Sequence, residues 1–416
     1  MQSLIKPHSM INRHAESQVL TALNDTRIVA LAGPRQSGKT TLVHKIAKDQ
    51  GMSFVTLDDH LSRHFANYDP AGFLQQHGRA VIDEIQRAPE LFLELKKNVD
   101  EMPQPGRFLI TGSVDLFKRT ISPDSLAGRV EAITLLPFSQ SEIEQIQQPE
   151  FLEHAFSENF PAYLETGRTL KLVERIVTGG YPEVFTRKTS ARRRVWFQEY
   201  VRALATRDVT DISLVLKTQE LMRLLDHAAT AAGQLVNLSR IASQLGVDSK
   251  TVDQWLALFE QMFVIKRVPA WHRNTSKRLV KAPKLHFLDS GLLAALSRTE
   301  LDDIRTDRAR LGSLLEGFVY SELHKQAAQS SEPTYISHYR DKDKVEVDFV
   351  IERMGKIVGI EVKAAVSVKP GDFSGLNRLK NAADDAFVCG IVLHDGENIL
   401  RAGDKMLAMP VNRLWL

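Results

Sequence analysis

Five short, mainly apolar runs divide the first 137 residues of the chain, and polar and helical segments separate them. The runs lie at residues 27–32, 53–59, 79–85, 107–113 and 130–136. Apolar runs of this length suit strands that are covered on both faces. Their alternation with helices, and the polar residues at the strand ends, predict an α/β domain built on a doubly wound parallel sheet.

The pattern changes after residue 137, and three further segments follow. The first is mainly helical, the second has the cadence of a helix-turn-helix, and the third combines an amphipathic helix with alternating strands. A second, C-terminal α/β domain is therefore predicted. The predicted domain boundaries are 1–137, 138–212, 213–284 and 285–416.

The composition is that of an ordinary soluble globular protein, with 43% hydrophobic and 25% charged residues. A net charge of +3 is small, so affinity for nucleic acid would have to come from local basic patches. The single cysteine, Cys389, excludes a disulfide framework and a cysteine-based zinc site, and its apolar neighbours predict a core strand. The N-terminal residues lack the apolar segment of a signal peptide, and no apolar run approaches the roughly 18 residues that span a bilayer. A cytoplasmic protein is therefore expected.

The segment after the first apolar run fits the phosphate-binding pattern G-x-x-x-x-G-K-[ST] without a mismatch. A strand precedes it and a helix follows, so backbone N–H groups and the helix N-terminus would face a phosphate. Lys39 would reach the β- and γ-phosphates of ATP, and Thr40 would place its hydroxyl on Mg²⁺. The predicted cofactor-binding residues are Gly33, Pro34, Arg35, Gln36, Ser37, Gly38, Lys39, Thr40 and Thr41.

Two later apolar runs end in residues that suit triphosphate hydrolysis. The third run carries Asp83, which would hold Mg²⁺, and Glu84, which would orient and polarise the attacking water, as in a Walker B motif. The fourth run ends in Thr111 and Ser113, and either hydroxyl could contact the γ-phosphate or the water as a sensor. The alternative is that these two residues only terminate the strand.

The order of phosphate loop, Asp-Glu strand, Thr/Ser strand and a final arginine resembles that of the AAA+ ATPases. In that family an arginine just before the fifth strand often acts on the γ-phosphate of a neighbouring subunit, and Arg129 matches that position. A planar guanidinium there can stabilise the charge of the transition state. The resemblance implies a helical lid at 138–212 and an oligomer, such as a ring, with sites between subunits. Otherwise Arg129 is a solvated surface residue.

Residues 236–256 carry the predicted helix-turn-helix, in which Gly246 permits the tight turn and Ser249 can cap the second helix. The strands of a wing would follow at 259–270, which gives a winged helix. Residues 262–288 contain no acid and could track DNA phosphates; their basic residues include Lys266, Arg267, Arg273, Lys277, Arg278, Lys281 and Lys284. DNA is therefore a predicted partner, although winged helices also serve as protein-interaction modules.

Two adjacent predicted strands carry a second candidate site. Asp348, followed by Glu361-x-Lys363, resembles the PD-(D/E)xK nuclease pattern and implies a restriction-endonuclease-like fold. Glu361 and Lys363 are two residues apart, so they share one face of their strand. Asp348 and Glu361 could bind Mg²⁺ together, and Lys363 could steady a nucleophilic water. Glu316, in a preceding helix, would supply a further metal-facing acid, as nucleases of this fold often have. The alternative is a fold kept for binding alone.

Together, the phosphate loop, winged helix and E-x-K segment resemble a prokaryotic family of AAA-type ATPases that carry a C-terminal domain of unknown function. These features predict a protein that hydrolyses ATP and acts on DNA by remodelling or processing it, with metal-dependent cleavage left open. One alternative is a nucleotide-controlled regulatory switch, antitoxin-like or signalling, whose C-terminal modules bind protein partners. Another is a motor that remodels DNA junctions without cutting them.

Overall fold

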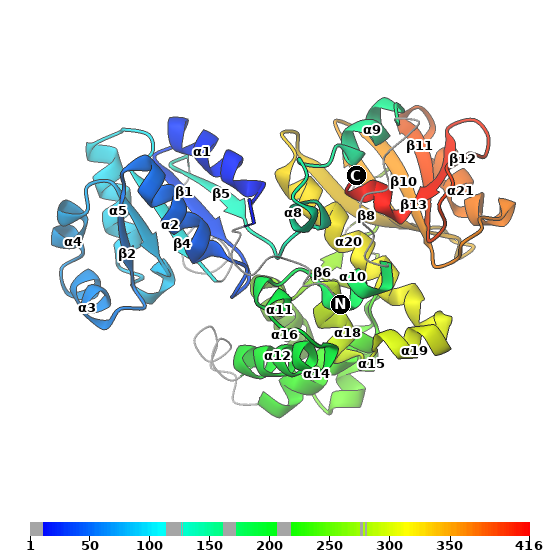
Figure 1. The fold of residues 1–416 in the computed structure, drawn as a ribbon, viewed down its shortest axis with the longest axis horizontal. Coiled ribbons are helices and arrows are strands. Elements are labelled where there is room, and N and C mark those ends of the chain that lie inside the picture. Colours follow the sequence, from blue (N-terminus) through cyan, green and yellow to red (C-terminus); the bar gives the residue numbers. More distant parts are fainter. Residues whose placement is uncertain are drawn as a thin grey trace. The chain divides into compact units, whose positions relative to one another are not determined.

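The computed structural model describes residues 11–113, 126, 128–160, 172–205, 218–274, 278 and 281–416. They form two compact units (Figure 1). The first unit holds the described residues up to Phe138 together with Gln261–Phe263, and the second holds those of Ser139–Glu260 and Val264–Leu416. None of the helices in these ranges combines the length and the hydropathy needed to cross a bilayer.

The first unit contains a five-stranded sheet in the order β2-β3-β4-β1-β5, and all neighbouring strands are parallel. The bounds are β1 (Ile28–Ala32), β2 (Ser53–Thr56), β3 (Ala80–Asp83), β4 (Phe108–Gly112) and β5 (Val130–Thr134). Each strand lies within one of the five predicted runs, which confirms the α/β class and the parallel sheet. Because the strands are parallel, their carboxyl ends meet at one edge, where Thr111 pairs with Leu31 and Asp83 with Thr56.

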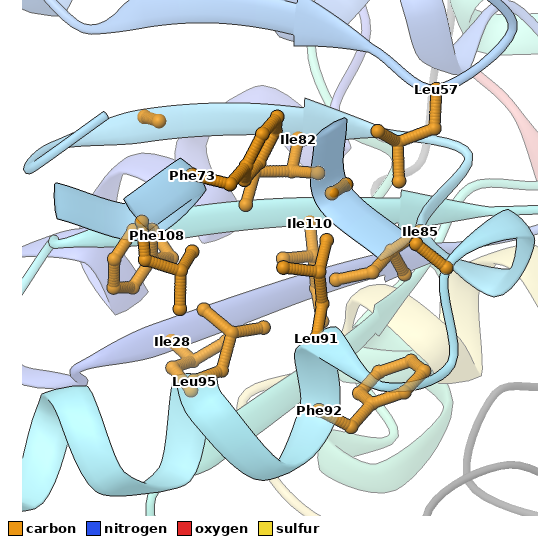
Figure 2. Packing of buried hydrophobic residues seen from close by; sticks show 14 of the residues in the cluster. Ile28, Leu57, Phe73, Ile82, Ile85, Leu91, Phe92, Leu95, Phe108 and Ile110 are labelled. Carbon is orange, nitrogen blue, oxygen red and sulfur yellow. The ribbon is translucent and has the colours of Figure 1, made fainter. Parts of the chain in front are cut away.

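Helices cover both faces of this sheet. The described ones are α1 (Ala15–Asp25), α2 (Lys39–Gln50), α3 (His60–Tyr68), α4 (Pro70–Gln76) and α5 (Leu91–Glu101), with a 3-10 turn, η1 (Ile85–Arg87). Successive strand side chains point to opposite faces. Accordingly, Ile28 and Ala30 of β1 pack in a cluster with α5, whereas Val29 and Leu31 pack with α1 and α2. Figure 2 shows the first cluster, with Leu95 of α5 beside Ile28.

The second unit begins with short helices. Its described helices before the C-terminal sheet are α8 (Gln140–Glu144), α9 (Phe151–Ser157), α10 (Leu172–Thr178), α11 (Pro182–Phe185), α12 (Ser190–Ala203), α14 (Thr218–Thr230), α15 (Leu238–Leu245), α16 (Ser249–Gln261), α18 (Ser290–Leu296), α19 (Leu301–Thr306) and α20 (Leu311–Gln329), with η3 (Arg308–Arg310).

Helices α15 and α16 have the predicted helix–turn–helix arrangement. Gly246 ends α15 in the left-handed conformation, with φ of 67°. The cap of α16 differs from the prediction, because Asp248 and not Ser249 supplies it. The Asp248 carboxylate accepts a hydrogen bond from the Thr251 N–H at 2.8 Å and a second from the Thr251 hydroxyl at 2.6 Å. Asp248 stands three residues before Thr251, the spacing at which a cap side chain reaches an unpaired helix N–H.

The strands after α16 also differ from the expected wing. Strand β6 (Ile265–Val268) pairs antiparallel with β7 (Lys284–Phe287), which lies beyond the predicted 259–270 segment. Residues 259–261 still belong to α16. The partner of β6 therefore comes from a more distant part of the chain, which a search for a local hairpin does not find.

The C-terminal sheet has six strands in the order β12-β13-β11-β10-β9-β8. Its bounds are β8 (Thr334–Arg340), β9 (Glu346–Arg353), β10 (Lys356–Lys363), β11 (Phe387–His394), β12 (Leu400–Arg401) and β13 (Met406–Pro410), with α21 (Ser374–Ala383), η4 (Pro370–Phe373), η5 (Asp384–Ala386) and η6 (Val411–Leu414). The pairs β10–β11 and β11–β13 are parallel and the others antiparallel. Cys389 is buried on β11, as predicted.

The first helices of the segment predicted as a lid contact α20 and the C-terminal sheet. The Gln140 N–H, at the start of α8, donates to Glu322 Oε2 of α20 at 2.9 Å. The Cys389 thiol of β11 donates to the carbonyl of Ala155, a residue of α9, at 3.3 Å. Helices α8 and α9 are thus part of the second unit, together with the C-terminal sheet.

The packing of α5 yields a stability prediction. Leu95 is fully buried in the cluster with Ile28, whereas Leu93 of the same helix is 61% exposed. Leu95→Ala should therefore lower the free energy of unfolding of the first unit by about 2–5 kcal/mol. The matched variant Leu93→Ala should stay within about 0.5 kcal/mol of the wild type.

All four tryptophans lie after residue 138, so tryptophan fluorescence does not report on the first unit. Amide hydrogen exchange in peptides that cover β1 and β4 gives the required measurement. Equal exchange rates in the Leu93→Ala and Leu95→Ala proteins would contradict the assignment of α5 to this core.

Candidate functional site

The phosphate-loop residues 33–38 connect the end of β1 with the start of α2. Gly33 lies so close to the segment after β5 that a Cβ at this position would sit 2.2 Å from the Leu135 carbonyl oxygen. Only glycine fits such an approach. The loop is therefore held against the sheet, with the N-terminus of α2 directed at the space beyond the carboxyl ends of the strands.

Lys39 is buried and its ammonium folds back onto the loop. Lys39 Nζ donates to the carbonyl oxygens of Gly33 and Pro34, both at 2.9 Å. The Ser37 hydroxyl is also buried, and it has no hydrogen-bond partner among the described residues. A buried ammonium and a buried hydroxyl without a partner fit a loop that receives the oxygen atoms of a phosphate.

Arg13 braces the loop from outside the motif, and the sequence analysis missed it. Its guanidinium is buried, donates to the Ser37 carbonyl at 2.7 Å and to the Leu136 carbonyl at 2.6 Å, and lies 4.8 Å from the centre of the Phe138 ring. Arg13 precedes Gly33, the first residue of the loop, by 20 residues and belongs to no pattern, so no local signal identifies it.

Asp83 receives hydrogen bonds from two hydroxyls at the carboxyl end of β3. The Thr40 hydroxyl donates to Asp83 Oδ2 at 3.1 Å, and the Thr111 hydroxyl donates to Asp83 Oδ1 at 2.5 Å. Asp83 is only 2% exposed. A threonine hydroxyl beside a carboxylate is a set of hard oxygen donors of the kind that Mg²⁺ prefers. The predicted metal pair of Thr40 and Asp83 is thus brought together, and it fits the ion.

Glu84 follows Asp83 in a left-handed backbone conformation, with φ of 58°. This conformation is uncommon for a residue other than glycine. The Glu84 N–H donates to the Thr111 hydroxyl at 3.1 Å, and the Glu84 carboxylate contacts the Gln86 amide. The same Gln86 amide donates to the Ser113 hydroxyl at 3.2 Å. Thr111 therefore contacts Asp83 and Glu84 directly, whereas Ser113 reaches Glu84 only through Gln86, a residue that the sequence analysis did not select.

Arg129 lies at the opposite edge of the sheet from the phosphate loop. It precedes β5, whose first residue, Val130, pairs with Ile28 at the start of β1. Its guanidinium contacts Asp100 of α5 with two bonds, Nε to Oδ1 at 2.6 Å and Nη2 to Oδ2 at 2.9 Å. The hydrogen bond from Arg129 lowers the pKa of Asp100. Arg129 is thus separated from the nucleotide site of its own chain by the length of the strands.

The second candidate site gathers side chains from two strands and a helix. Asp348 lies on β9, Glu361 and Lys363 lie on the adjacent β10, and Glu316 lies on α20. Asp348 Oδ2 accepts a hydrogen bond from the Val362 N–H at 2.9 Å, and Lys363 Nζ lies 2.7 Å from Glu361 Oε1. The predicted neighbours on β9 and β10 are therefore close in space.

Lys284 of β7 occupies the centre of this carboxylate cluster. Its Nζ atom lies 3.2 Å from Asp348 Oδ1, 3.3 Å from Glu316 Oε1 and 3.6 Å from Glu346 Oε2. The side chain is only 4% exposed. The prediction that Lys284 tracks DNA phosphates is therefore wrong, because its ammonium is buried. The alternation in Lys-Leu-His-Phe places Lys284 and His286 on one face of β7, but it does not reveal the acidic partners.

The ionisation of the cluster follows from burial and from the mutual effects of its charges. Burial, and after it the negative charge of Asp348, raises the pKa of Glu316 and of Glu361 above the ordinary value. Burial alone would lower the pKa of the Lys284 ammonium, but Asp348, Glu316 and Glu346 raise it. Lys284 is thus a permanent cation at neutral pH.

The described residues include no group of three or more His, Cys, Asp or Glu side chains arranged to hold a metal ion. The predicted ligands Glu316, Asp348 and Glu361 are close, but the ammonium of Lys284 stands between Glu316 and Asp348. The cluster as folded does not fit a divalent metal.

The predicted basic stretch 266–284 is largely engaged in internal ion pairs. Arg267 contacts Glu260 at 2.8 Å as well as Asp253, and Arg278 contacts Glu352 at 2.8 Å. Lys277 lies outside the described residues. A separate cleft of about 740 Å³ has a basic and aromatic lining that includes Trp271, Arg273, Lys281, Tyr339, Arg340 and Lys342. Arg340 of this cleft is paired with Glu346 at 2.9 Å. Arg273 and Lys342 are exposed, and Arg273 lies 3.8 Å from Asp384 in an exposed ion pair.

Three segments of the chain match protein families. Residues 25–144 match the AAA domain. Residues 169–303 match the domain of unknown function DUF8612, and residues 311–414 match the domain of unknown function DUF4143. The AAA match covers β1 to β5 and the phosphate loop, while the DUF4143 match begins at α20 and covers the C-terminal sheet.

Two mycobacterial proteins are similar over almost the whole chain. Uncharacterized protein Mb2031c of Mycobacterium bovis and uncharacterized protein Rv2008c of Mycobacterium tuberculosis are each 25% identical over 405 residues, which is 97% of this chain and 84% of the relative.

Among solved structures, the Walker-type ATPase PABY2304 of Pyrococcus abyssi is 14% identical, with 70% of this chain and 97% of that chain covered and a TM-score of 0.43. AMPPCP-bound DnaA from Aquifex aeolicus is 13% identical, with 59% and 86% covered and a TM-score of 0.29. Residues 25–144 thus match the AAA domain, and within them the phosphate loop and the parallel sheet have the arrangement of a P-loop ATPase core.

Proposed function

We propose that this protein binds ATP with Mg²⁺, hydrolyses it, and uses the cycle to act on DNA through its second unit. The observation that carries the ATPase part is the hydrogen-bonded group of Thr40, Asp83 and Thr111 beside the phosphate loop. In this group Thr40 and Asp83 are the proposed metal ligands, and Glu84 follows Asp83 at the end of β3. These are the parts that phosphoryl transfer to water requires.

Each residue of the site has a separate part in this proposal. Lys39 turns from the Gly33 and Pro34 carbonyls to the β- and γ-phosphates, and the backbone N–H groups of the loop surround them. Thr40 and Asp83 hold Mg²⁺, which neutralises the developing phosphate charge when bound. Glu84 orients the attacking water and accepts its proton. Thr111 fixes the positions of Asp83 and the Glu84 backbone.

Arg129 would act only on the ATP of another copy of the chain. Its position at the start of β5 lies across the sheet from the phosphate loop of its own subunit. To reach a neighbour's γ-phosphate, the Arg129 guanidinium would give up its two hydrogen bonds to Asp100. It would then donate the same two bonds to phosphate oxygens. An oligomer with shared sites follows from this proposal.

Two features of the second unit support DNA as the partner. Helices α15 and α16 are joined as in DNA-binding helix-turn-helix modules. The cleft with Trp271, Arg273 and Lys342 offers basic side chains beside aromatic ones, which suits phosphates and bases. The DNA contact in this proposal is binding and remodelling, with the carboxylate cluster of the C-terminal sheet taking no part in cleavage.

One observation favours the alternative of a nucleotide-controlled switch that binds a protein. The exposed side of α16 carries Lys250, Asp253 and Gln254, so its net charge is close to zero. Asp253 also neutralises Arg267. A recognition helix without net positive charge gains little from DNA phosphates and suits a protein surface equally well.

The role of Glu84 predicts a separation of binding from turnover. Glu84→Gln should lower kcat for ATP hydrolysis by about 100-fold to 10,000-fold, because the general base is lost. The dissociation constant for ATP should change by less than about threefold, since the amide keeps the shape of the side chain. A coupled phosphate-release assay and equilibrium binding of a fluorescent ATP analogue measure the two quantities. Glu90→Gln, a nearby exposed position, is the matched control, and unchanged turnover in Glu84→Gln would contradict the proposal.

The contacts of Thr111 predict that it, and not Ser113, is the sensor. Thr111→Val keeps the shape but removes one of the two hydroxyl donors to the Asp83 carboxylate and the acceptor of the Glu84 N–H, at a cost of about 1–3 kcal/mol. Turnover should fall by roughly 5-fold to 150-fold, with ATP binding retained. Thr111→Ser should restore most of it. Ser113→Ala removes only a contact to Gln86 and should cost less than about threefold. An equal loss in Ser113→Ala would assign the role to Ser113.

The basic cleft predicts a salt-dependent contact with DNA. Removing Arg273 and Lys342 together by alanine substitution should weaken binding to single-stranded and duplex DNA and reduce the slope of log K against log salt by about 2. Arg401→Ala, an exposed arginine on β12, is the control and should leave binding unchanged. Fluorescence anisotropy at several salt concentrations measures both. Absence of DNA binding by the wild type would favour the protein-binding switch.

A further inference from the structure

The carboxylate cluster of the C-terminal sheet receives a cation from outside that sheet. Glu316, Glu346 and Asp348 belong to α20 and β9, whereas Lys284 belongs to β7, which pairs with β6 and not with the six-stranded sheet. The ammonium nevertheless lies within 3.6 Å of an oxygen of each of the three carboxylates. It is the only cation of the described residues that contacts both Glu316 and Asp348.

This ammonium has the position that a divalent ion would need. An ion shared by a helix and an adjacent strand would bind Glu316 Oε1 and Asp348 Oδ1, and these are the two atoms that Lys284 Nζ approaches most closely, at 3.3 and 3.2 Å. Mg²⁺ requires oxygen ligands at about 2.0–2.1 Å and would occupy the same space. Two cations within a few ångströms in a buried site repel each other strongly. The ammonium and a metal ion therefore exclude each other.

The charges of the cluster are already nearly balanced. The fourth carboxylate, Glu361, is paired with Lys363 at 2.7 Å. Glu346 has a second partner in Arg340 at 2.9 Å. Four carboxylates thus face three cations, so little negative charge remains to attract a divalent ion away from water. A metal site of the expected type needs the carboxylates without these partners.

Backbone pairing on both sides keeps Lys284 in place. On one side Lys284 pairs with Val268 of β6. On the other side it forms an isolated bridge with Leu235, and the Val236 N–H donates to the Pro283 carbonyl at 2.8 Å. The side chain therefore projects from a strand whose backbone is paired on both sides at this residue, and not from a loose loop. The Lys284 side chain is only 4% exposed, so a change of rotamer that took its ammonium away from the carboxylates would leave buried charges without partners.

The loop before α15 closes the cluster from a further direction. Gly233 N–H donates to the Leu285 carbonyl at 2.8 Å, which fixes this loop on β7. A Cβ at Gly233 would lie 2.9 Å from Glu316 Oε2, so the loop backbone rests against the carboxylate. Gly233 also has φ of 77°, which favours glycine. Access of solvent or of a hydrated ion to Glu316 is reduced accordingly.

We propose that Lys284 takes the place of the divalent metal in the C-terminal domain, so that the carboxylate cluster binds no metal ion and instead fixes β7 and the 233–236 loop to α20 and β9. The PD-(D/E)xK-like residues then form a structural joint between the helix–turn–helix segment and the C-terminal sheet. This inference goes beyond the proposed ATPase and does not depend on it. It excludes metal-dependent cleavage at this cluster in the native fold.

Binding of Mn²⁺ to the full-length protein tests the proposal, with electron paramagnetic resonance of free Mn²⁺ as the measurement. All proteins carry Asp83→Asn and contain no nucleotide, so the phosphate-loop metal position is removed. The parent protein should bind no stoichiometric Mn²⁺. Adding Lys284→Ala frees the carboxylates, and one equivalent should bind at least about tenfold more tightly than any residual binding to the parent. Lys281→Ala is the control, because Lys281 Nζ donates to the Arg340 carbonyl at 2.9 Å and forms no ion pair with the carboxylates of the described cluster.

Two outcomes overturn the proposal. In one, the parent binds one equivalent of Mn²⁺ and loses it when Asp348→Asn is added, which shows a metal site beside Lys284. In the other, a folded Lys284→Ala protein gains no Mn²⁺, which shows that the carboxylates form no latent cation site. The parent measurement stands even where Lys284→Ala fails to fold, since the loss of a partner from a buried ion pair is destabilising.

Lys284→Met provides the second variant, because it keeps the length of the side chain and removes its charge. Its melting temperature should rise with added Mn²⁺, since a ligand that binds only the folded state stabilises it by mass action. The parent and Lys281→Ala proteins should show no such rise. An equal rise in the parent would overturn the proposal in the same way as direct binding.

Discussion

The hydrogen bonds of the Asp83 carboxylate hold the parts of the nucleotide site together. The carboxylate is almost completely buried at the end of β3, and a buried charge needs donors around it. Thr40 supplies one from the start of α2, and Thr111 supplies the other from β4. One side chain thus joins the phosphate loop to two neighbouring strands. The parallel register makes this possible, because it brings the carboxyl ends of β1, β3 and β4 to a single edge.

The carboxylates of the second unit meet the same physical requirement in another way. Their charge is balanced by the ammonium of Lys284, which arrives from a strand outside the sheet. The two hydroxyls around Asp83 are neutral, so the metal ion proposed for this position would meet no charge of its own sign there. An ammonium fixed by backbone pairing does not admit such an ion, because it carries charge of the same sign as the ion. Asp83 therefore has neutral partners that a metal ion could replace. The carboxylates around Lys284 have a charged partner that is fixed in place.

Local patterns predicted the strands and the phosphate loop, because both depend on residues close together in sequence. The order of the strands and the contacts of Arg13 and Lys284 depend on residues far apart, and no local signal contains them. Period-two alternation gives Thr111 and Ser113 the same side of the fourth apolar run, so the pattern could not choose between them. Only the three-dimensional contacts with Asp83 distinguish Thr111. The PD-(D/E)xK pattern singled out Asp348, Glu361 and Lys363, which lie on adjacent strands, but it contains no information on a cation from a separate strand.

Arg13 gives the phosphate loop a direct connection to the segment that leaves the first unit. Its guanidinium holds the Ser37 carbonyl of the loop and the Leu136 carbonyl after β5, and it lies over the Phe138 ring, where the first unit ends. All three contacts are made by the rigid, planar guanidinium of Arg13, so the position of one contacted group restricts the positions of the other two. Arg13 therefore links the Ser37 carbonyl of the phosphate loop to residues 136–138 through a single side chain. The segment at the end of the first unit is thus held by the same side chain that braces the phosphate loop.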